Sequence, residues 1–230
     1  MMRRTNLISA VAVVVWLAVL PAQALPTSYS GALTTADGGL LGTGAWVTHP
    51  SYDITFDWTV TQNPDLSWHY RYTFDSTGIQ GNISHLVIEV SDSFTANDLL
   101  NTVPAVDGSG PQWHSVLNGN NNIPEAVFGL KFQNPATSVM TVEFDSWRSP
   151  VWGDVYAKDG QAGGQGFNTL WNAGFTSPDG DPDVPPDNGS YEFHVLVPDT
   201  TTVLIPAPGA LLLAGLGAAG VNYLRRHRIL

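Results

Sequence analysis

The strongest constraint on the fold is a strict alternation of large apolar and polar side chains in two neighbouring segments, 52–60 and 68–75. In the first, Tyr52, Ile54, Phe56, Trp58 and Val60 alternate with Asp and Thr; in the second, Trp68, Tyr70, Tyr72 and Phe74 alternate with His69, Arg71, Thr73 and Asp75. A period of two places one set of side chains on one face of a β-strand. The turn-forming residues 62–65 separate the segments, so the pattern predicts an antiparallel hairpin with a buried aromatic face.

Further short segments carry the same signal, with frequent Gly, Pro and Asn between them. We predict strands over 85–90, 127–132, 139–144, 151–156 and 191–197, a weaker one over 42–47, and a short helical turn over 95–100. Segment 85–90 is more continuously apolar than the alternating segments, which is typical of a strand covered on both faces. Eight or nine such strands predict an all-β fold, an antiparallel β-sandwich or jelly roll.

The N-terminal residues 1–24 have the pattern of a secretory signal peptide. Arg3 and Arg4 precede the apolar run 7–20, and Ala22 and Ala24 form an A-x-A cleavage site. The run is short for a membrane span, and an anchor helix has no need of a small-residue cleavage site. We therefore expect a cleaved signal helix and an exported protein.

The C-terminal region, 203–228, predicts a single transmembrane helix. Residues 208–224 carry no charge and are followed by Arg225, Arg226 and Arg228. Seventeen uncharged residues reach the lower limit for crossing a bilayer, and flanking positive charge favours the cytoplasmic side. This predicts a single-pass precursor whose C-terminus lies in the cytoplasm and whose body, 25–202, lies outside the cell.

Charge is distributed very unevenly between the body and the ends. The body holds all 20 acidic residues and four of the nine basic ones, a formal net charge of −16. Such a surface repels nucleic acid and anionic lipid head groups and attracts cations such as calcium. The chain has no cysteine, which excludes disulfides, thiolate metal sites and a Cys nucleophile.

The tail resembles the PEP-CTERM sorting signal, in which a proline tripeptide precedes an apolar helix and a terminal arginine cluster. Here the tripeptide is Pro206-Ala207-Pro208, which lacks the glutamate of the Pro-Glu-Pro signature. The body is also similar to ectodomains that carry such tails, around 83–90, 128–132 and 151–160. The resemblance implies processing by an exosortase in bacteria that make exopolysaccharide, with residues 206–208 as substrate positions.

The loop that follows residue 177 is the sharpest candidate for a ligand site. Asp179, Asp181, Asp183 and Asp187 lie within nine residues, and carboxylates at alternate positions can converge on a calcium ion. Val184 and Ser190 stand where an EF-hand loop has glycine and glutamate. The alternative is a solvated loop without an ion. The histidines show no zinc-site spacing, and His69 and His194 are predicted on the polar sides of strands.

Aromatic side chains in or beside loops provide a second candidate site. Trp113, Trp147, Trp152 and Trp171 could stack against sugar rings; the alternative is that they cap the ends of the core. The chain has no nucleophile elbow, catalytic triad or phosphate-binding loop. We therefore predict a non-enzymatic surface protein with a structural or adhesive role in a polysaccharide or biofilm matrix. The alternative is a carbohydrate-binding module or weak glycosidase that uses these aromatics and acids such as Glu89, Glu143 and Asp145.

Overall fold

A computed structural model describes residues 27–47, 51–107, 110–160, 166–176 and 181–198. These residues form 13 strands and four 3₁₀ turns, with no α-helix among them. The strands are β1 (Ser28–Thr34), β2 (Leu40–Gly42), β3 (Thr55–Gln62), β4 (Trp68–Asp75), β5 (Ile83–Glu89), β6 (Leu100–Val103), β7 (Gln112–His114), β8 (Val127–Thr137), β9 (Val139–Ser146), β10 (Pro150–Gly153), β11 (Val155–Asp159), β12 (Thr169–Asn172) and β13 (Val195–Pro198). The 3₁₀ turns are η1 (Gly44–Trp46), η2 (Ala96–Asp98), η3 (Val116–Asn118) and η4 (Ala173–Thr176).

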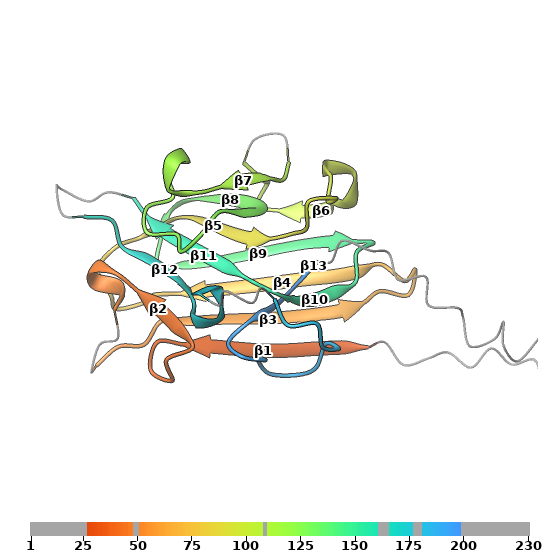
Figure 1. Cartoon of the computed structure of the whole chain (residues 1–230), viewed down its shortest axis with the longest axis horizontal. Helices are drawn as coiled ribbons and strands as arrows, with labels where there is room; N and C mark the ends of the chain where they lie inside the picture. Colours follow the sequence, from red (N-terminus) through yellow and green to blue (C-terminus); the bar gives the residue numbers. More distant parts are fainter. Residues whose placement is uncertain (1–26, 48–50, 108–109, 161–165, 177–180, 199–230) are drawn as a thin grey trace, which may run out of the picture. The chain divides into compact units, whose positions relative to one another are not determined.

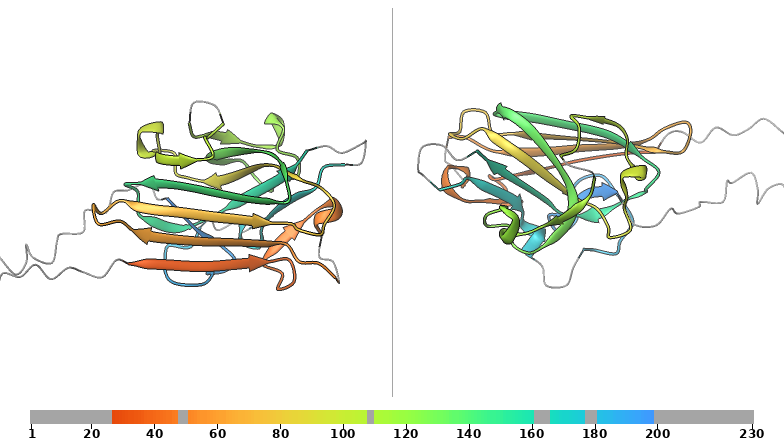
Figure 2. Two further views of the ribbon diagram at one scale, coloured as in Figure 1. Left: turned by 180° about the vertical axis from the view of Figure 1, so that it is seen from behind. Right: turned by 90° about the horizontal axis from the view of Figure 1, so that it is seen from above.

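The strands pair throughout in the antiparallel sense, and most of them form two sheets (Figure 1). One has five strands in the order β1-β3-β4-β9-β6, and the other has six in the order β2-β12-β11-β5-β8-β7. A separate two-stranded ribbon pairs β10 with β13. The two sheets lie as facing layers in the view from above (Figure 2). The prediction of an all-β antiparallel fold is confirmed.

The predicted aromatic hairpin forms the centre of the five-stranded sheet. β3 pairs with β4 in the register that places Phe56 opposite Phe74 and Trp58 opposite Tyr72. The predicted inward side chains are buried from Ile54 onward, but Tyr52 precedes the strand and is exposed, so its expected place on this face was wrong. Phe144 of β9 stacks on Phe132 of β8 with ring centroids 5.9 Å apart. This contact joins the two layers in one core.

Strand β5 is covered on both faces, as its consecutive apolar residues 86–88 predict. Leu86 and Ile88 pack in the core between the sheets. Val87 points the other way into a smaller cluster with Ile123, Val127, Tyr156 and Phe175. β5 therefore lies well inside the molecule. Glu89, at its end, is half-buried.

Several predicted elements differ from those observed. The predicted strand 151–156 is two strands, β10 and β11, separated at Asp154. The predicted strand 191–197 begins only at Val195, because Glu192 and Phe193 have left-handed φ angles of 48° and 61°. Segment 42–47 contains the end of β2 and the turn η1, while β1, β6, β7 and β12 were not predicted.

The predicted signal peptide, 1–24, and the predicted sorting signal, 203–228, lie outside the described residues. Within the described ranges, no helix has the length and apolar character needed to cross a membrane.

Candidate functional site

The break between β10 and β11 places an acidic side chain beside the core. β10 pairs with β13, whereas β11 pairs with β5 and β12, so the chain changes partners at Asp154. The backbone stays bonded to β5 at this point, because Glu89 N–H donates to Asp154 O (3.0 Å). The Asp154 residue is only 7% exposed. A carboxylate thus occupies a buried position that an uninterrupted strand would give to an apolar residue.

A tight turn before β13 delivers His194 to the same place. The N–H of His194 donates to Tyr191 O, which closes the turn made by Glu192 and Phe193. The imidazole is 2% exposed, and its Nδ1 lies 3.3 Å from Tyr191 O. The ring packs against the backbone of Gly174, where a Cβ atom would lie 2.6 Å from Nδ1. The expectation that His194 lies on the polar side of a strand was therefore wrong.

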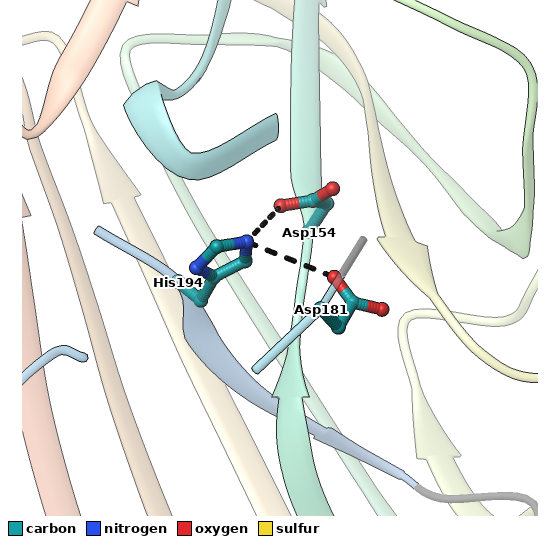
Figure 3. Close-up of side chains that lie close together, drawn as sticks. All are labelled: Asp154, Asp181 and His194. Carbon is teal, nitrogen blue, oxygen red and sulfur yellow. Dashed lines mark ion pairs between the residues drawn. The ribbon is translucent and has the colours of Figure 1, made fainter. Parts of the chain in front are cut away.

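The loop residue Asp181 completes a cluster with these two side chains (Figure 3). His194 Nε2 is 3.7 Å from Asp154 Oδ1 and 3.8 Å from Asp181 Oδ1. One ligand atom from each residue lies within 4.8 Å of the other two. The Asp181 side chain is 39% exposed, so the cluster opens to solvent on this side. A strand break, a loop and a turn thus bring three ligand atoms close together.

The electrostatic environment of the cluster is strongly acidic. Burial, against the opposing effect of the hydrogen bond from Asn172 and with smaller contributions from the charges of Asp181 and Glu125, raises the pKa of Asp154 to about 7. Glu89 accepts a hydrogen bond from Asp154 N–H (2.8 Å), and burial together with the neighbouring Asp181 and Asp154 raises its pKa well above the usual value. These shifts mean that the carboxylates carry full negative charge at neutral pH only at a cost in free energy.

Asn172, at the end of β12, holds two parts of the cluster in place. Its Nδ2 donates to Asp154 Oδ1 (2.7 Å) and to Phe193 O (2.9 Å), while its Oδ1 accepts from Val155 N–H (2.9 Å). The side chain is fully buried. One amide therefore fixes the Asp154 carboxylate and the turn that carries His194.

Of the acidic loop residues predicted to bind calcium, Asp181 alone joins this cluster among those described. Asp179 lies outside the described residues. Asp183 and Asp187 are exposed, and Asp187 Oδ1 accepts a hydrogen bond from Asn188 N–H (2.8 Å). Sequence reasoning missed Asp154 and His194. The available signal was a carboxylate interrupting the apolar run 151–157.

The four predicted tryptophans lie in different environments. Trp113 and Trp147 are exposed, Trp171 is partly buried against the smaller apolar cluster, and Trp152 is 2% exposed in the core. Trp152 therefore caps the core and is not available for sugar stacking. Trp113 and Trp171 lie on strands four positions apart in the six-stranded sheet, a separation of about 19 Å. The four side chains do not form one platform.

Two of the three acids considered for glycoside hydrolysis, Glu143 and Asp145, form ion pairs. Glu143 pairs with Arg71 (2.8 Å), and Asp145 pairs with His69 (2.7 Å) and accepts from Asn101 Nδ2 (2.7 Å). Burial opposes ionisation of Asp145, but its hydrogen bonds outweigh that effect and lower its pKa. The Asp145 carboxyl is thus held ionised, which does not suit the proton-donating role of a glycosidase acid.

A polar hollow of about 350 Å³ lies elsewhere in the molecule. Its lining includes Gln80, Asp159 and Asn168 together with the glycines Gly44, Gly81 and Gly166. Asp159 is 3% exposed, and its Oδ1 accepts from Asn168 N–H (2.8 Å). A carboxylate and amides around such a space can hydrogen-bond a polar ligand.

No protein-family model, curated protein or solved structure was found to match the chain.

Proposed function

We propose that this chain is the precursor of an exported surface protein that an exosortase-type protease processes. The body would have a structural or adhesive role in an extracellular polysaccharide or biofilm matrix, either anchored at the envelope or released. Before processing, a signal helix would direct export, and a C-terminal helix would hold the precursor in the membrane. The observation that carries the proposal is the order of the tail: Pro206-Ala207-Pro208, an uncharged apolar stretch, and Arg225, Arg226 and Arg228.

The position of the strands supports this proposal. Every strand in the described residues begins after Ala24 and ends before Val203. Cleavage at both predicted positions would therefore leave each of these strands and their shared core intact. The acidic, cysteine-free composition of the body suits a soluble matrix component, because a large net charge disfavours self-association.

The processing step can be tested in a host that makes exopolysaccharide, with and without its exosortase. We expect intact-mass analysis of the envelope and medium to show loss of the tail only when the protease is present. Replacing Pro206 and Pro208 by alanine should leave the tail uncleaved, whereas Pro185→Ala, in the exposed loop of the body, should be processed normally. Equal masses in both hosts would refute the proposal.

Carbohydrate binding is the second candidate, favoured by the polar hollow beside Asp159 and by the exposed indole of Trp113. A glycan array with the wild-type protein and the Trp113→Ala and Gln80→Ala variants would test both surfaces. We expect a glycan signal that one of the two variants removes. If no glycan binds, the purely structural role stands; turnover of a reducing-end substrate would instead show a glycosidase.

A further inference from the structure

The three ligand atoms of the Asp154–Asp181–His194 cluster converge without bonding to one another. A direct N–H···O hydrogen bond has a typical donor–acceptor distance of about 2.7–3.2 Å, and a contact of about 3.6 Å or longer is not one. The distances from His194 Nε2 to the carboxylate oxygens are 3.7 and 3.8 Å, which is too long for either carboxylate to accept a hydrogen bond from the ring. The side chains therefore surround a small gap.

The other ring nitrogen determines what His194 presents to that gap. Nδ1 faces Tyr191 O at 3.3 Å, and because a carbonyl can only accept, Nδ1 carries the proton in this contact. In the neutral ring, Nε2 then presents its lone pair to two carboxylates. A lone pair facing two carboxylates is repulsive unless a proton or a metal ion lies between them, and distances of 3.7 and 3.8 Å are long for a shared proton. This arrangement, with Nδ1–H bonded to a carbonyl and Nε2 free to coordinate, is the usual one for a metal-ligating histidine.

The acidic groups around the cluster also favour binding of a cation. The carboxylate of Glu125 adds to the negative potential at both Asp154 and Asp181, and the Glu89 carboxyl is held beside Asp154 by the hydrogen bond from Asp154 N–H. The ion pairs of Arg71, Lys131 and Arg148 go instead to Glu143, Asp107 and Asp98. Lys158 lies elsewhere, bonded to Gly119 O and Asn121 Oδ1. Three of the four cations of the body thus pair with other carboxylates, and the fourth is bonded to uncharged oxygens away from the cluster.

We propose that Asp154, Asp181 and His194 bind one divalent transition-metal ion of the zinc type, with His194 Nε2 and one oxygen of each carboxylate as ligands. Zinc binds nitrogen and oxygen at about 2.0–2.2 Å in tetrahedral geometry, which separates neighbouring ligand atoms by about 3.4 Å. The observed 3.7 and 3.8 Å are within a few tenths of an ångström of that spacing. Calcium instead takes six to eight oxygen ligands, and a buried imidazole does not suit it.

The environment supplies the other features of a metal site. Asn172 donates to the Asp154 carboxylate, Tyr191 O accepts from His194 Nδ1, and Gly174 leaves room for the ring. Such supporting contacts orient ligands before the metal arrives. The exposed side of Asp181 provides the entry path and leaves a coordination position for water. The bound ion would fasten the loop at 181 and the turn at 191–194 to the β10–β11 break, in a chain without disulfides.

Metal titration of the full-length protein, in detergent and after dialysis against EDTA, tests the proposal. With Zn²⁺ as the titrant in calorimetry, we expect one tight site per chain and a rise in the thermal unfolding midpoint. Asp181→Asn should weaken Zn²⁺ binding by at least about 10-fold, and His194→Ala by about 100-fold or more. Cobalt as a spectroscopic substitute should give the strong visible absorption of a tetrahedral site.

Asp183→Asn is the matched control, because it removes the same charge two residues away from an exposed position of the same loop. It should change Zn²⁺ affinity by less than about twofold, since long-range charge at the surface is screened. Because the Asp181 side chain is partly exposed, we expect Asp181→Asn to fold normally, so weaker Zn²⁺ binding in this variant would not be caused by misfolding. Absence of Zn²⁺ binding, or equal affinity in Asp181→Asn and Asp183→Asn, would overturn the proposal. Tighter binding of Ca²⁺ that depends on Asp183 would overturn it in favour of a calcium loop.

Discussion

At the scale of single residues, buried side chains with several partners decide how the site and its surroundings hold together. Asn172 satisfies a carboxylate, a backbone carbonyl and a backbone N–H at once. His85 and His114 are buried histidines whose pKa values are lowered chiefly by burial. Because such groups exchange water for fixed partners, losing one partner costs more than an average surface contact contributes.

Replacing Asn172 by alanine should destabilise the metal-free protein by about 2–5 kcal/mol, since Val155 N–H, Phe193 O and Asp154 each lose a partner in a buried position. Urea unfolding followed by tryptophan fluorescence measures the change. The control is Asn188→Ala, which removes an exposed acceptor of Ser30 N–H (2.9 Å) and should cost about 1 kcal/mol or less. Similar losses in the two variants would contradict the role assigned to Asn172.

The stability of the protein should depend on the titration of His85. Burial lowers the pKa of His85 to about 4, with Lys131 adding to the effect, whereas the unfolded value is 6.5. Between these values only the unfolded chain binds the proton, so stability falls as pH falls from 6.5 to about 4, by about 3 kcal/mol from this group. His85→Gln keeps a donor for Asn120 Oδ1 but does not titrate.

The readout is the difference in unfolding free energy between the wild type and His85→Gln at pH 7 and pH 4.5. As the pH falls, the wild type should lose more unfolding free energy than His85→Gln does. Comparing two proteins is necessary because the raised pKa values of Asp154 and Glu89 act in the opposite direction in the same range. Parallel pH profiles would show that His85 is not the buried titrating group described.

Only part of the candidate site could be predicted from residues alone. The loop carboxylates, including Asp181, were identified because several acids at alternate positions repel one another without a cation. Asp154 and His194 were not identified, because each lies in a segment whose sequence pattern predicts a strand. A polar residue in such a segment is normally assigned to the solvent face. Their meeting depends on strand pairing between segments distant in sequence. No local pattern encodes that pairing.

At the scale of elements, the alternation of side chains predicts strands well but not where they end. The register of β3 with β4 follows directly from two matching aromatic faces. The early end of the last predicted strand does not, since Tyr191, Phe193, Val195 and Val197 alternate without interruption. What ends it is tertiary: the turn is held by the bond from Asn172 to Phe193 O and by the burial of His194.

The packing of β1 on β3 depends on a glycine. Gly31 lies opposite Trp58, and a Cβ atom there would be 2.2 Å from the indole and 2.7 Å from Gly189 O. Gly31→Ala should therefore destabilise the protein by about 1–3 kcal/mol, the usual cost of overpacking. Gly160→Ala has open space around its Cβ and should change stability by less than about 1 kcal/mol. Chemical denaturation compares the two, and an unaffected Gly31→Ala would mean that β1 is not seated as described.

At the scale of the whole molecule, one core unites the two sheets in a body whose net charge is strongly negative. The stack of Phe132 on Phe144 and the bond from Tyr72 Oη to Leu196 O (2.8 Å) connect separate sheets. The all-β class follows from composition and alternation, since the aromatic content must be buried and has a period of two. The order of strands in the sheets depends on long-range pairing, which periodicity does not specify.

The net charge of −16 on residues 25–204 predicts that salt stabilises the folded protein. Each of the acidic side chains adds to a mutual repulsion that is greater in the compact state than in the unfolded chain, and dissolved ions screen it. With EDTA present to exclude divalent ions, raising NaCl from low to high concentration should raise the unfolding midpoint by about 2–4 °C, the shift that about 1 kcal/mol gives in a domain of this size. Choline chloride should give the same rise, because screening depends on ionic strength and not on the identity of the cation. An increase with NaCl alone would point to a bound sodium ion, and a fall with both salts would mean that the few ion pairs of the body outweigh its self-repulsion.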